Sequence, residues 1–470
     1  MVERNGKGRA FGFRDKLGYL FGDFGNDFTF LLSSSFLLKF YTDVMGVSAA
    51  VVGVAMMVAR FVDAFTDVAM GRICDRSRIR PAGKFKPWIL RMSGPVALAS
   101  FLIYQSAFAE YSMTFKIIWL FVTYILWGSV FYTSINIPYG SMASAISAEP
   151  GDRQSLSTFR SIGGTLAGLI IGAGVPMFAY QSDEAGNLIL DGGRFTLIAG
   201  IFSGLAVLCY LLCYFLTTER VRAEGAREAG VRDKHNNVFR MLKDAFRNRA
   251  LISIIVASVF MLLAQLTMQQ MANYVYPNFY GNTTAQSVST IVMVIAMFIA
   301  AALAKPAAER FGKAEVSVVA NLLAAGVCFL LFLVRPENVW VYVALISLCW
   351  LGLGMFSMVN WALITDVIDA SELRNGIRED GSVYALYSFA RKLGQAAAAG
   401  ASGGLLTWIG YSEATAFEPE VTRGIFNIST LLPAIGFLLL ALILWFWYPL
   451  HKKQVEKNVL ELKKKRGEHV

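Results

Sequence analysis

The sequence predicts an all-α membrane protein with twelve transmembrane helices in two pseudo-symmetric six-helix bundles. Hydrophobic residues make up 56% of the 470-residue chain, and charged residues make up only 16%. Soluble proteins carry about 25% charged residues. Apolar runs of about 20 residues, the length that crosses a bilayer, recur along the chain. One long polar stretch, residues 218–248, separates these runs into two equal sets.

Each half of the chain holds six expected spans. In the first half they cover residues 17–41, 46–74, 88–108, 115–146, 157–180 and 195–217. In the second half they cover residues 249–279, 285–308, 315–335, 339–370, 382–410 and 424–449. The expected domains are an N-terminal bundle (1–217), a central cytoplasmic loop (218–248), a C-terminal bundle (249–450) and a basic cytoplasmic tail (451–470). Two related six-helix halves are the arrangement of many secondary transporters.

Lysine and arginine residues concentrate in alternate gaps between the expected spans. The basic gaps are the N-terminus, residues 72–91, the central loop, residues 305–313 and the tail. This pattern follows the positive-inside rule, so we expect an integral protein of the plasma (inner) membrane with both termini in the cytoplasm. The net charge of +10 therefore reflects the loops, and we expect no nucleic-acid partner. The basic first sixteen residues show no cleavable signal peptide.

The sequence lacks the motifs of common enzymes. It contains no Gly-x-x-x-x-Gly-Lys-Ser/Thr phosphate loop and no His-Glu-x-x-His zinc motif. Its five cysteines mostly lie in apolar runs, which is typical of small buried side chains. All three histidines lie in polar segments, so a histidine proton relay inside the membrane is excluded. We therefore expect a protein that is not an enzyme and that binds no cofactor.

Two acidic residues, Asp63 and Asp67, lie in the middle of an expected span, with Arg60 one turn earlier. Residues four apart share one face of a helix. Ionised groups at this depth cost about 2.5–3.5 kcal/mol each on insertion scales and usually mark an ion or substrate path. Two such carboxylates share a proton or bind a metal cation. We expect them to bind Na⁺ or Li⁺, if not H⁺, with a hydroxyl such as Thr133 as a further oxygen ligand.

Further polar residues inside the expected spans suit sugar recognition. Charged and amide groups that bind hydroxyls are available at Asp27, Asn136, Arg160 and Lys392, and aromatic faces at Trp127, Trp361, Tyr132 and Tyr384. Aromatic residues at helical spacing are more often packing residues. A purely structural salt-bridge network would also satisfy these charges. The concentration of the acids in the first two spans favours a cation site instead.

Several motifs resemble a known family. They are residues 41–48 (Tyr-Thr-Asp-Val-Met-Gly-Val-Ser), the acidic helix 59–67, the loop 83–90 (Gly-Lys-Phe-Lys-Pro-Trp-Ile-Leu), and the shorter stretches 123–128, 136–139 and 366–369. Together they resemble the glycoside–pentoside–hexuronide:cation symporters, the melibiose-permease-like family of the major facilitator superfamily. The resemblance extends from about residue 16 to about residue 448.

The resemblance implies a twelve-helix, alternating-access carrier that imports a sugar or glycoside with Na⁺, Li⁺ or H⁺. It implies cation binding at Asp63, Asp67 and Thr133. It implies sugar binding by the charged and amide group listed above: Asp27, Asn136, Arg160 and Lys392. It also implies gating by a cytoplasmic loop that contains Asp369, Glu372 and Arg378.

The sequence departs from the melibiose branch at three positions. That branch has an aspartate where Asn136 stands, a tryptophan where Gly140 stands, and its span-10 tryptophan maps onto Ser357, one turn from Trp361. The sugar therefore stays open, whereas the cation pair is unaffected. We expect a protein that works as a monomer in the lipid bilayer. A lysolipid or amphipathic-drug carrier on the same fold is the alternative. The loop 218–249 and the tail 452–470 are too short for the signalling domain that a membrane sensor would need.

Overall fold

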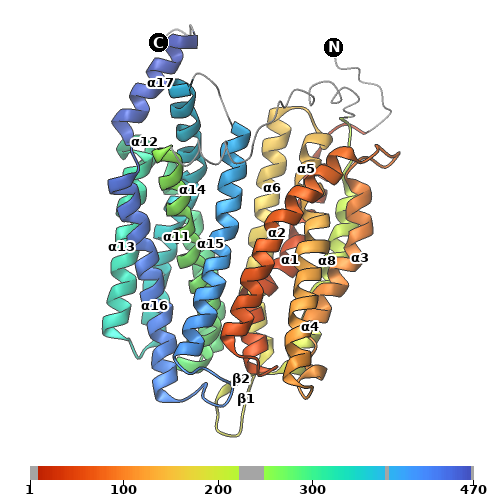
Figure 1. The fold of residues 1–470 in the computed structure, drawn as a ribbon, viewed down its shortest axis with the longest axis vertical. Coiled ribbons are helices and arrows are strands. Elements are labelled where there is room, and N and C mark those ends of the chain that lie inside the picture. Colours follow the sequence, from red (N-terminus) through yellow and green to blue (C-terminus); the bar gives the residue numbers. More distant parts are fainter. Residues whose placement is uncertain (1–8, 222–247, 376–379, 467–470) are drawn as a thin grey trace. The chain divides into compact units, whose positions relative to one another are not determined.

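The computed structural model describes residues 9–221, 248–375 and 380–466. The chain divides into two compact units, Met1–Arg232 with Ser412–Ala414, and Asp233–Tyr411 with Thr415–Val470. Each unit is a bundle of long helices (Figure 1).

The N-terminal unit contains six long helical stretches, two of which include a π-helical turn and a second helix. They are α1 (Phe13–Asp43), α2 (Ala49–Arg76), α3 (Lys86–Ile103), α4–η2–α5 (Met113–Ile125, Leu126–Tyr132 and Thr133–Ile146), α6–η3–α7 (Pro150–Leu169, Ile170–Gly174 and Val175–Ala179) and α8 (Gly192–Leu216). A short 3₁₀ helix, η1 (Ser106–Phe108), follows α3. An antiparallel hairpin of β1 (Tyr180–Ser182) and β2 (Leu188–Leu190) joins α7 to α8, with Tyr180 opposite Leu190.

The C-terminal unit repeats this plan. Its helical stretches are α11–η4 (Arg249–Tyr274 and Val275–Phe279), α12 (Thr283–Phe311), α13 (Lys313–Val334), α14 (Val339–Asn375), α15 (Asp380–Trp408) and α16–η5 (Pro419–Leu442 and Ile443–Trp447). The tail forms a further helix, α17 (Lys452–Arg466), which packs against α13 and α14.

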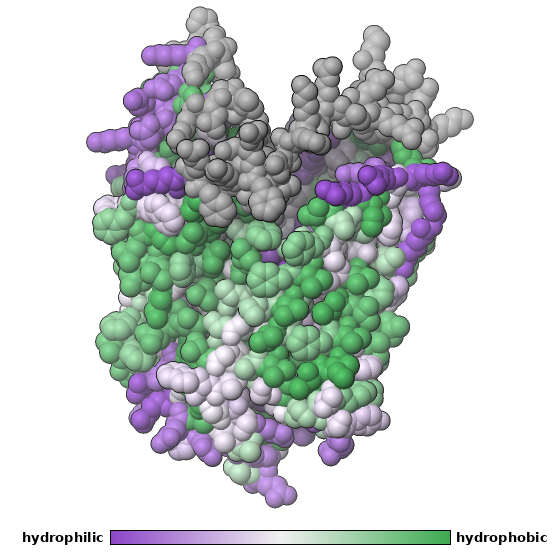
Figure 2. All heavy atoms as spheres, in the orientation of Figure 1, coloured by the Kyte–Doolittle hydropathy of each residue, from purple (hydrophilic) through white to green (hydrophobic). Residues whose placement is uncertain are grey.

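The prediction of an all-α membrane protein is confirmed. Among the described residues, nine helical stretches are long and apolar enough to cross a membrane, and α1, α3 and α15 are the long stretches outside that set. On the face drawn in Figure 2, apolar side chains cover the middle of each unit, and hydrophilic side chains gather toward its ends. The hydrocarbon of a membrane contains no water that could hydrogen-bond to backbone groups. Helices, whose backbone hydrogen bonds are internal, therefore suit the apolar middle of each unit.

Some expected boundaries were wrong, for physical reasons. The helix expected from residue 157 begins at Pro150, because its polar first turns lowered the apparent hydropathy and proline suits the first helical turn. The span expected to reach residue 108 ends at Ile103. The loop expected after residue 370 is helical as far as Asn375, so Asp369 and Glu372 lie on α14. Arg378 lies outside the described residues.

Close packing of α6 against α1 brings the backbone of α6 near the acidic side chains of α1. A Cβ atom added at Gly163 would lie 2.6 Å from the carbonyl oxygen of Leu20 in α1. Only glycine permits this backbone approach. The next residue, Gly164, faces the acidic side chains of α1.

Candidate cation and sugar sites

The two acidic residues of α2 each accept a hydrogen bond from a hydroxyl of the η2–α5 stretch. Ser129 Oγ donates to Asp63 Oδ1 at 2.5 Å. Thr133 Oγ1 donates to Asp67 Oδ1 at 2.8 Å. Because both pairs are spaced four residues apart, two neighbouring helical turns of one segment face two of the other. The structure therefore brings together Asp63, Asp67 and Thr133, and it adds Ser129 to them.

The backbone around Ser129 is irregular. Residues Leu126–Tyr132 form the π-helical turn η2, a rare conformation that often marks functional sites. Thr133 Oγ1 also lies 3.2 Å from the carbonyl oxygen of Gly128. A Cβ atom at Gly128 would lie 3.6 Å from Asp63 Oδ1. This is an ordinary contact distance, and it places the backbone of η2 directly beside the carboxylate.

Arg60 supplies one positive charge to this group. Its Nη1 lies 3.0 Å from Asp63 Oδ2, and its Nη2 donates to the hydroxyl of Tyr124 at 3.0 Å. The guanidinium carbon lies 5.2 Å from the centre of the Phe30 ring, within range of a cation–π contact. Arg60 and Asp63 are 9% and 5% exposed, so the ion pair is shielded from water.

A second charged group lies where α1 meets α6. Arg160 Nε donates to Asp23 Oδ1 at 2.9 Å. A Cβ atom added at Gly164 would lie 2.6 Å from Asp27 Oδ2 and 3.1 Å from Asp23 Oδ2. Both carboxylates therefore face the same bare stretch of α6, next to the arginine. The expected sugar ligands Asp27 and Arg160 are brought together here, with Asp23 between them in the charge network.

Amide and aromatic groups extend this polar surface. Asn26 Nδ2 donates to Asn136 Oδ1 at 3.4 Å, and the hydroxyl of Tyr210 donates to Asn26 Oδ1 at 3.0 Å. The guanidinium of Arg160 lies 5.3 Å from the centre of the Tyr139 ring, which stacks on Tyr19 at 4.6 Å. Amide, guanidinium and phenol groups are suited to binding the hydroxyls and apolar faces of a sugar.

The small residue Gly140 leaves space beside the arginine. A Cβ atom added there would lie 3.8 Å from Arg160 Nη1, an ordinary contact distance. The backbone of Gly140 therefore faces the guanidinium with no side chain between them.

The aromatic candidates differ in their environment. Trp127 is fully buried and packs against Tyr124 and Tyr132, with ring centres 5.6 Å and 5.5 Å apart. Trp361 is 43% exposed and contacts Tyr387 edge to face at 5.1 Å. These contacts make Trp127 part of the packing within its unit.

The remaining candidates belong to the C-terminal unit. Lys392 is half-buried on α15. The side chain of Tyr384 lies outside the described residues. Asp366 pairs through both carboxylate oxygens with Lys313 Nζ, at 2.6 and 2.8 Å, which ties α14 to the start of α13. Asn360 donates to the hydroxyl of Tyr387, and this bond ties α14 to α15.

Sequence reasoning missed Ser129, although a signal was present. Ser129 precedes Thr133 by four residues, the same spacing that links Asp63 to Asp67, so a hydroxyl pair opposite an acid pair was readable. Asp23 also belongs to the charged group, because it is 8% exposed and pairs with Arg160.

Comparison with known proteins identifies the family. A family model described as MFS/sugar transport protein matches residues 18–452. The chain belongs to this family. It is 30% identical to the uncharacterized symporter YjmB of Bacillus subtilis (strain 168), over 96% of this chain and 95% of the relative. It is also 30% identical to the glucuronide carrier protein homolog of Escherichia coli (strain K12), over 96% and 95%.

Other matches agree on the fold and the class of protein. The isoprimeverose transporter of Lactiplantibacillus pentosus is 29% identical over 92% of this chain and 88% of its own length. The crystal structure of a D-xylose-proton symporter aligns with 93% of this chain and 97% of its own, with a TM-score of 0.63 and 16% identity. The assignment to the melibiose-permease-like family is confirmed. The protein is a multi-pass membrane transporter and not an enzyme.

Proposed function

We propose that this protein is a secondary active symporter that imports a sugar or glycoside together with Na⁺, Li⁺ or H⁺ by alternating access. One observation carries the proposal: Asp63 and Asp67 each hold a hydroxyl, from Ser129 and Thr133, inside a membrane-spanning bundle. A hydroxyl is both a donor and an acceptor. It can therefore release its bond to the carboxylate and offer an oxygen lone pair to an arriving cation.

The formal charges of this group favour a single monovalent ion. Asp63 and Asp67 carry two negative charges, and Arg60, paired with Asp63 at 3.0 Å, carries one positive charge. The formal charges of these three side chains add to one negative charge, which one Na⁺, Li⁺ or H⁺ would balance. Oxygen donors are the ligands that hard cations prefer. Neutralising the group would relieve the repulsion between the carboxylates.

The charged and amide residues of α1, α5 and α6 support sugar recognition. Asp27, Asn136 and Arg160 are candidate sugar ligands in the N-terminal unit, and Lys392 and Trp361 are candidates in the C-terminal unit. The relatives are named for a glucuronide, for isoprimeverose and, in the putative sulfoquinovose importer of Salmonella typhimurium (30% identical), for a sulfonated sugar. We propose a substrate from this range of sugars.

Uptake by membrane vesicles tests the proposal. Radiolabelled glucuronide, isoprimeverose and sulfoquinovose are offered with a Na⁺ gradient, a Li⁺ gradient or a pH gradient imposed separately. We expect one gradient to drive accumulation of at least one sugar above its outside concentration. Transport of lysophospholipid with no response to any sugar would instead favour the alternative, a lysolipid carrier.

The charged pair between α1 and α6 provides the first mutational check. Arg160→Ala removes a charged hydrogen-bond donor worth about 1.5–3 kcal/mol, so we expect roughly a 10- to 100-fold rise in the half-saturating sugar concentration. The half-saturating cation concentration should change much less. Arg160→Lys keeps the charge but loses the fork of donors, so its half-saturating sugar concentration should lie between those of Arg160→Ala and the unaltered protein. Equal loss of sugar and cation affinity would show a structural role.

Sidedness, gating and oligomeric state complete the proposal. We propose that both termini face the cytoplasm of the inner membrane, because the basic gaps alternate along the chain. We propose that the acidic end of α14, with Asp369 and Glu372, contributes to a cytoplasmic gate. We also propose that the monomer is the functional unit. Reporter fusions at each terminus test the first point.

A further inference from the structure

The loop motif at residues 83–90 acquires a partner that lies far away in the chain. The side chain of Glu219, from the segment after α8, accepts hydrogen bonds from three consecutive backbone N–H groups at the start of α3. Lys84 N donates to Oε2 at 2.7 Å, and Phe85 N and Lys86 N donate to Oε1 at 2.9 and 2.8 Å. Glu219 is separated from these three donors by 133 to 135 positions in the sequence.

The start of α3 is well suited to hold a carboxylate. The first N–H groups of a helix have no partner within it, and the helix dipole places a partial positive charge there. The N-cap residue Phe85 has no side-chain oxygen to satisfy them, and the helix continues through Pro87. Glu219 therefore supplies from a distance the cap that the local sequence lacks.

Gly83 makes the approach of Glu219 possible. Its φ angle is +117°, which side chains other than glycine rarely adopt. A Cβ atom at this position would lie 2.5 Å from the carboxyl carbon of Glu219. Both the backbone conformation and the available space at residue 83 thus require glycine, which explains why this residue opens the motif.

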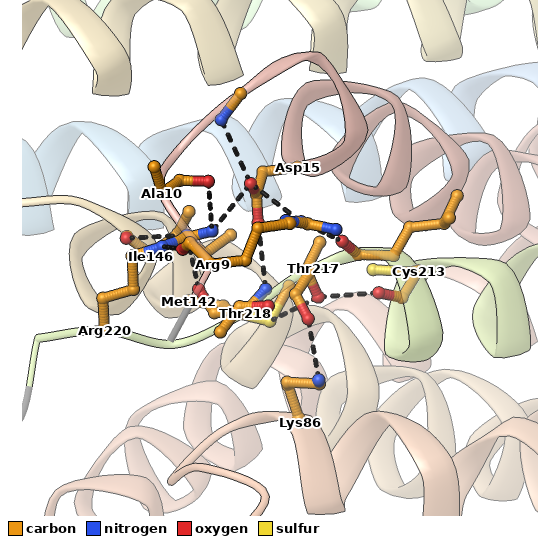
Figure 3. Close-up of polar contacts among 12 residues, drawn as sticks. Arg9, Ala10, Asp15, Lys86, Met142, Ile146, Cys213, Thr217, Thr218 and Arg220 are labelled. Atoms are coloured by element: carbon orange, nitrogen blue, oxygen red, sulfur yellow. Dashed lines mark hydrogen bonds and ion pairs between the residues drawn. The ribbon is translucent and has the colours of Figure 1, made fainter. Parts of the chain in front are cut away.

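Residues on both sides of Glu219 are held as firmly. Asp15 of α1 is fully buried and accepts hydrogen bonds from Thr218 N at 3.0 Å and from Arg220 Nη2 at 2.8 Å. Arg9 Nη2 pairs with the same carboxylate at 2.9 Å. Figure 3 shows Asp15 at the centre of these contacts, and Lys86 Nζ donating to the carbonyl of Thr217 at 2.7 Å.

The backbone after Glu219 is attached to α5. Arg220 N and Val221 N both donate to the carbonyl of Ala145, at 2.8 and 2.9 Å. Arg220 Nη1 also lies 3.3 Å from the carbonyl of Ile146, so it reaches the end of the same helix. We name residues 217–221, with these contacts to α1, α3 and α5, the exit clasp.

We propose that Glu219 fixes the exit clasp to the N-terminal unit, and that this attachment is required for transport turnover but not for sugar recognition. The segment that connects the two units begins directly after the clasp. Residues 217–221 are fixed to α1, α3 and α5, so their position follows that of the N-terminal unit. Glu219 is thus a positioning residue, and its turnover role rests on the proposed transport function.

Hydrogen exchange and uptake together test the proposal. Glu219→Ala should speed amide exchange at residues 84–86 in the purified protein by roughly tenfold or more, because three amides lose a charged acceptor. In proteoliposomes, its maximal uptake rate for the labelled glucuronide, isoprimeverose or sulfoquinovose should fall by roughly threefold or more, with the half-saturating sugar concentration within about twofold. Glu219→Gln, which keeps one acceptor oxygen, should lie between Glu219→Ala and the unaltered protein.

Matched variants guard the interpretation. Glu149→Ala is the control, because Glu149 is exposed at the start of α6 and its side chain makes no capping bond. Gly83→Ala disturbs the same contact from the α3 side and should have the same effects on exchange and uptake as Glu219→Ala. It therefore serves as the test if Glu219→Ala folds poorly.

Three results would overturn the proposal. Unchanged exchange at residues 84–86 would show that Glu219 does not hold α3. Faster exchange with an unchanged uptake rate would show that the attachment is dispensable. A parallel loss of sugar affinity would show a general defect. If the unaltered protein carries none of the three sugars, the proposed function fails and the turnover role with it, while the exchange data still decide whether the clasp exists.

Discussion

Two regions of the N-terminal unit, the exit clasp and the candidate cation site, hold acidic side chains in different ways. In the exit clasp, Glu219 is bound by three backbone N–H groups, and Asp15 by two backbone N–H groups and two arginines. In the candidate cation site, Ser129 and Thr133 each donate a hydroxyl hydrogen bond, to Asp63 and Asp67, and Arg60 pairs with the second oxygen of Asp63. A backbone N–H can only donate, whereas a hydroxyl can turn and accept. The first arrangement commits a carboxylate to the fold, and in the second the hydroxyls can turn an oxygen lone pair toward an ion.

The strongest way to break this comparison is to neutralise the available carboxylates. The double variant Asp63→Asn, Asp67→Asn should abolish cation-driven accumulation, because the amides carry no charge for a cation to balance. Sugar should then only equilibrate across the vesicle membrane. The control is Asp75→Asn, on the exposed end of the same helix. Accumulation that persists in the double variant would show that the driving cation does not bind at Asp63 and Asp67.

Neutralising a committed carboxylate should have the opposite profile. Asp15→Asn loses the charge that faces two arginines, and hydrogen bonds to charged groups contribute about 1.5–3 kcal/mol each. We therefore expect a lower thermal unfolding temperature of the purified protein. The half-saturating cation concentration should stay the same. A shifted cation dependence with unchanged stability would reverse the assignment of the two regions.

Removing a single hydroxyl sharpens the comparison. Ser129→Ala deletes one proposed cation ligand, so we expect the half-saturating Na⁺, Li⁺ or H⁺ concentration for uptake to rise by roughly 5- to 10-fold. Ser129→Thr keeps a hydroxyl, so its half-saturating cation concentration should stay close to that of the unaltered protein. The control Ser144→Ala removes an exposed hydroxyl that bonds only within its own helix, to the carbonyl of Ser141. An unchanged cation dependence in Ser129→Ala would leave Ser129 a packing residue.

The smallest change adds one methyl group beside the sugar candidates. Gly164→Ala would place a methyl 2.6 Å from Asp27 Oδ2, so the carboxylate must move by several tenths of an ångström. We expect the half-saturating sugar concentration to rise by roughly 3- to 10-fold, a cost of about 1 kcal/mol typical of a crowded site. Gly204→Ala, on α8, where nothing lies within 4 Å, is the control. Equal behaviour of the two variants would place the sugar elsewhere.

The sequence predicted the parts of these regions that depend on local spacing. Asp63 and Asp67 are four residues apart, so any helix places them on one face, and the ion pair with Arg60 follows from a spacing of three. The hydrophobic runs also located the long helices, because a run of apolar residues is a local feature of the sequence. The start of α6 was misplaced because its first turns are polar and amphipathic, and a search for hydrophobic runs does not detect such turns.

The exit clasp was beyond sequence reasoning because its contacts are long-range. Residues 218–221 read as the beginning of a polar loop. Only the fold shows that Glu219 reaches the start of α3 and that Arg220 meets Asp15, which is 205 positions away. Charge alone could not separate a residue that is committed to the fold from one that faces solvent.

The π-helical turn η2 has a consequence for how the two proposed ligands influence each other. Its hydrogen bonds span one residue more than those of an α-helix, so a change to α geometry that shifts the register by one residue would rotate the helix that follows by about 100°. Thr133, bonded to Asp67, and Asn136, bonded to Asn26, both lie on that helix. One backbone rearrangement would therefore withdraw an oxygen from the ion and an amide from the sugar at the same moment, a direct physical route to mutual dependence of their affinities.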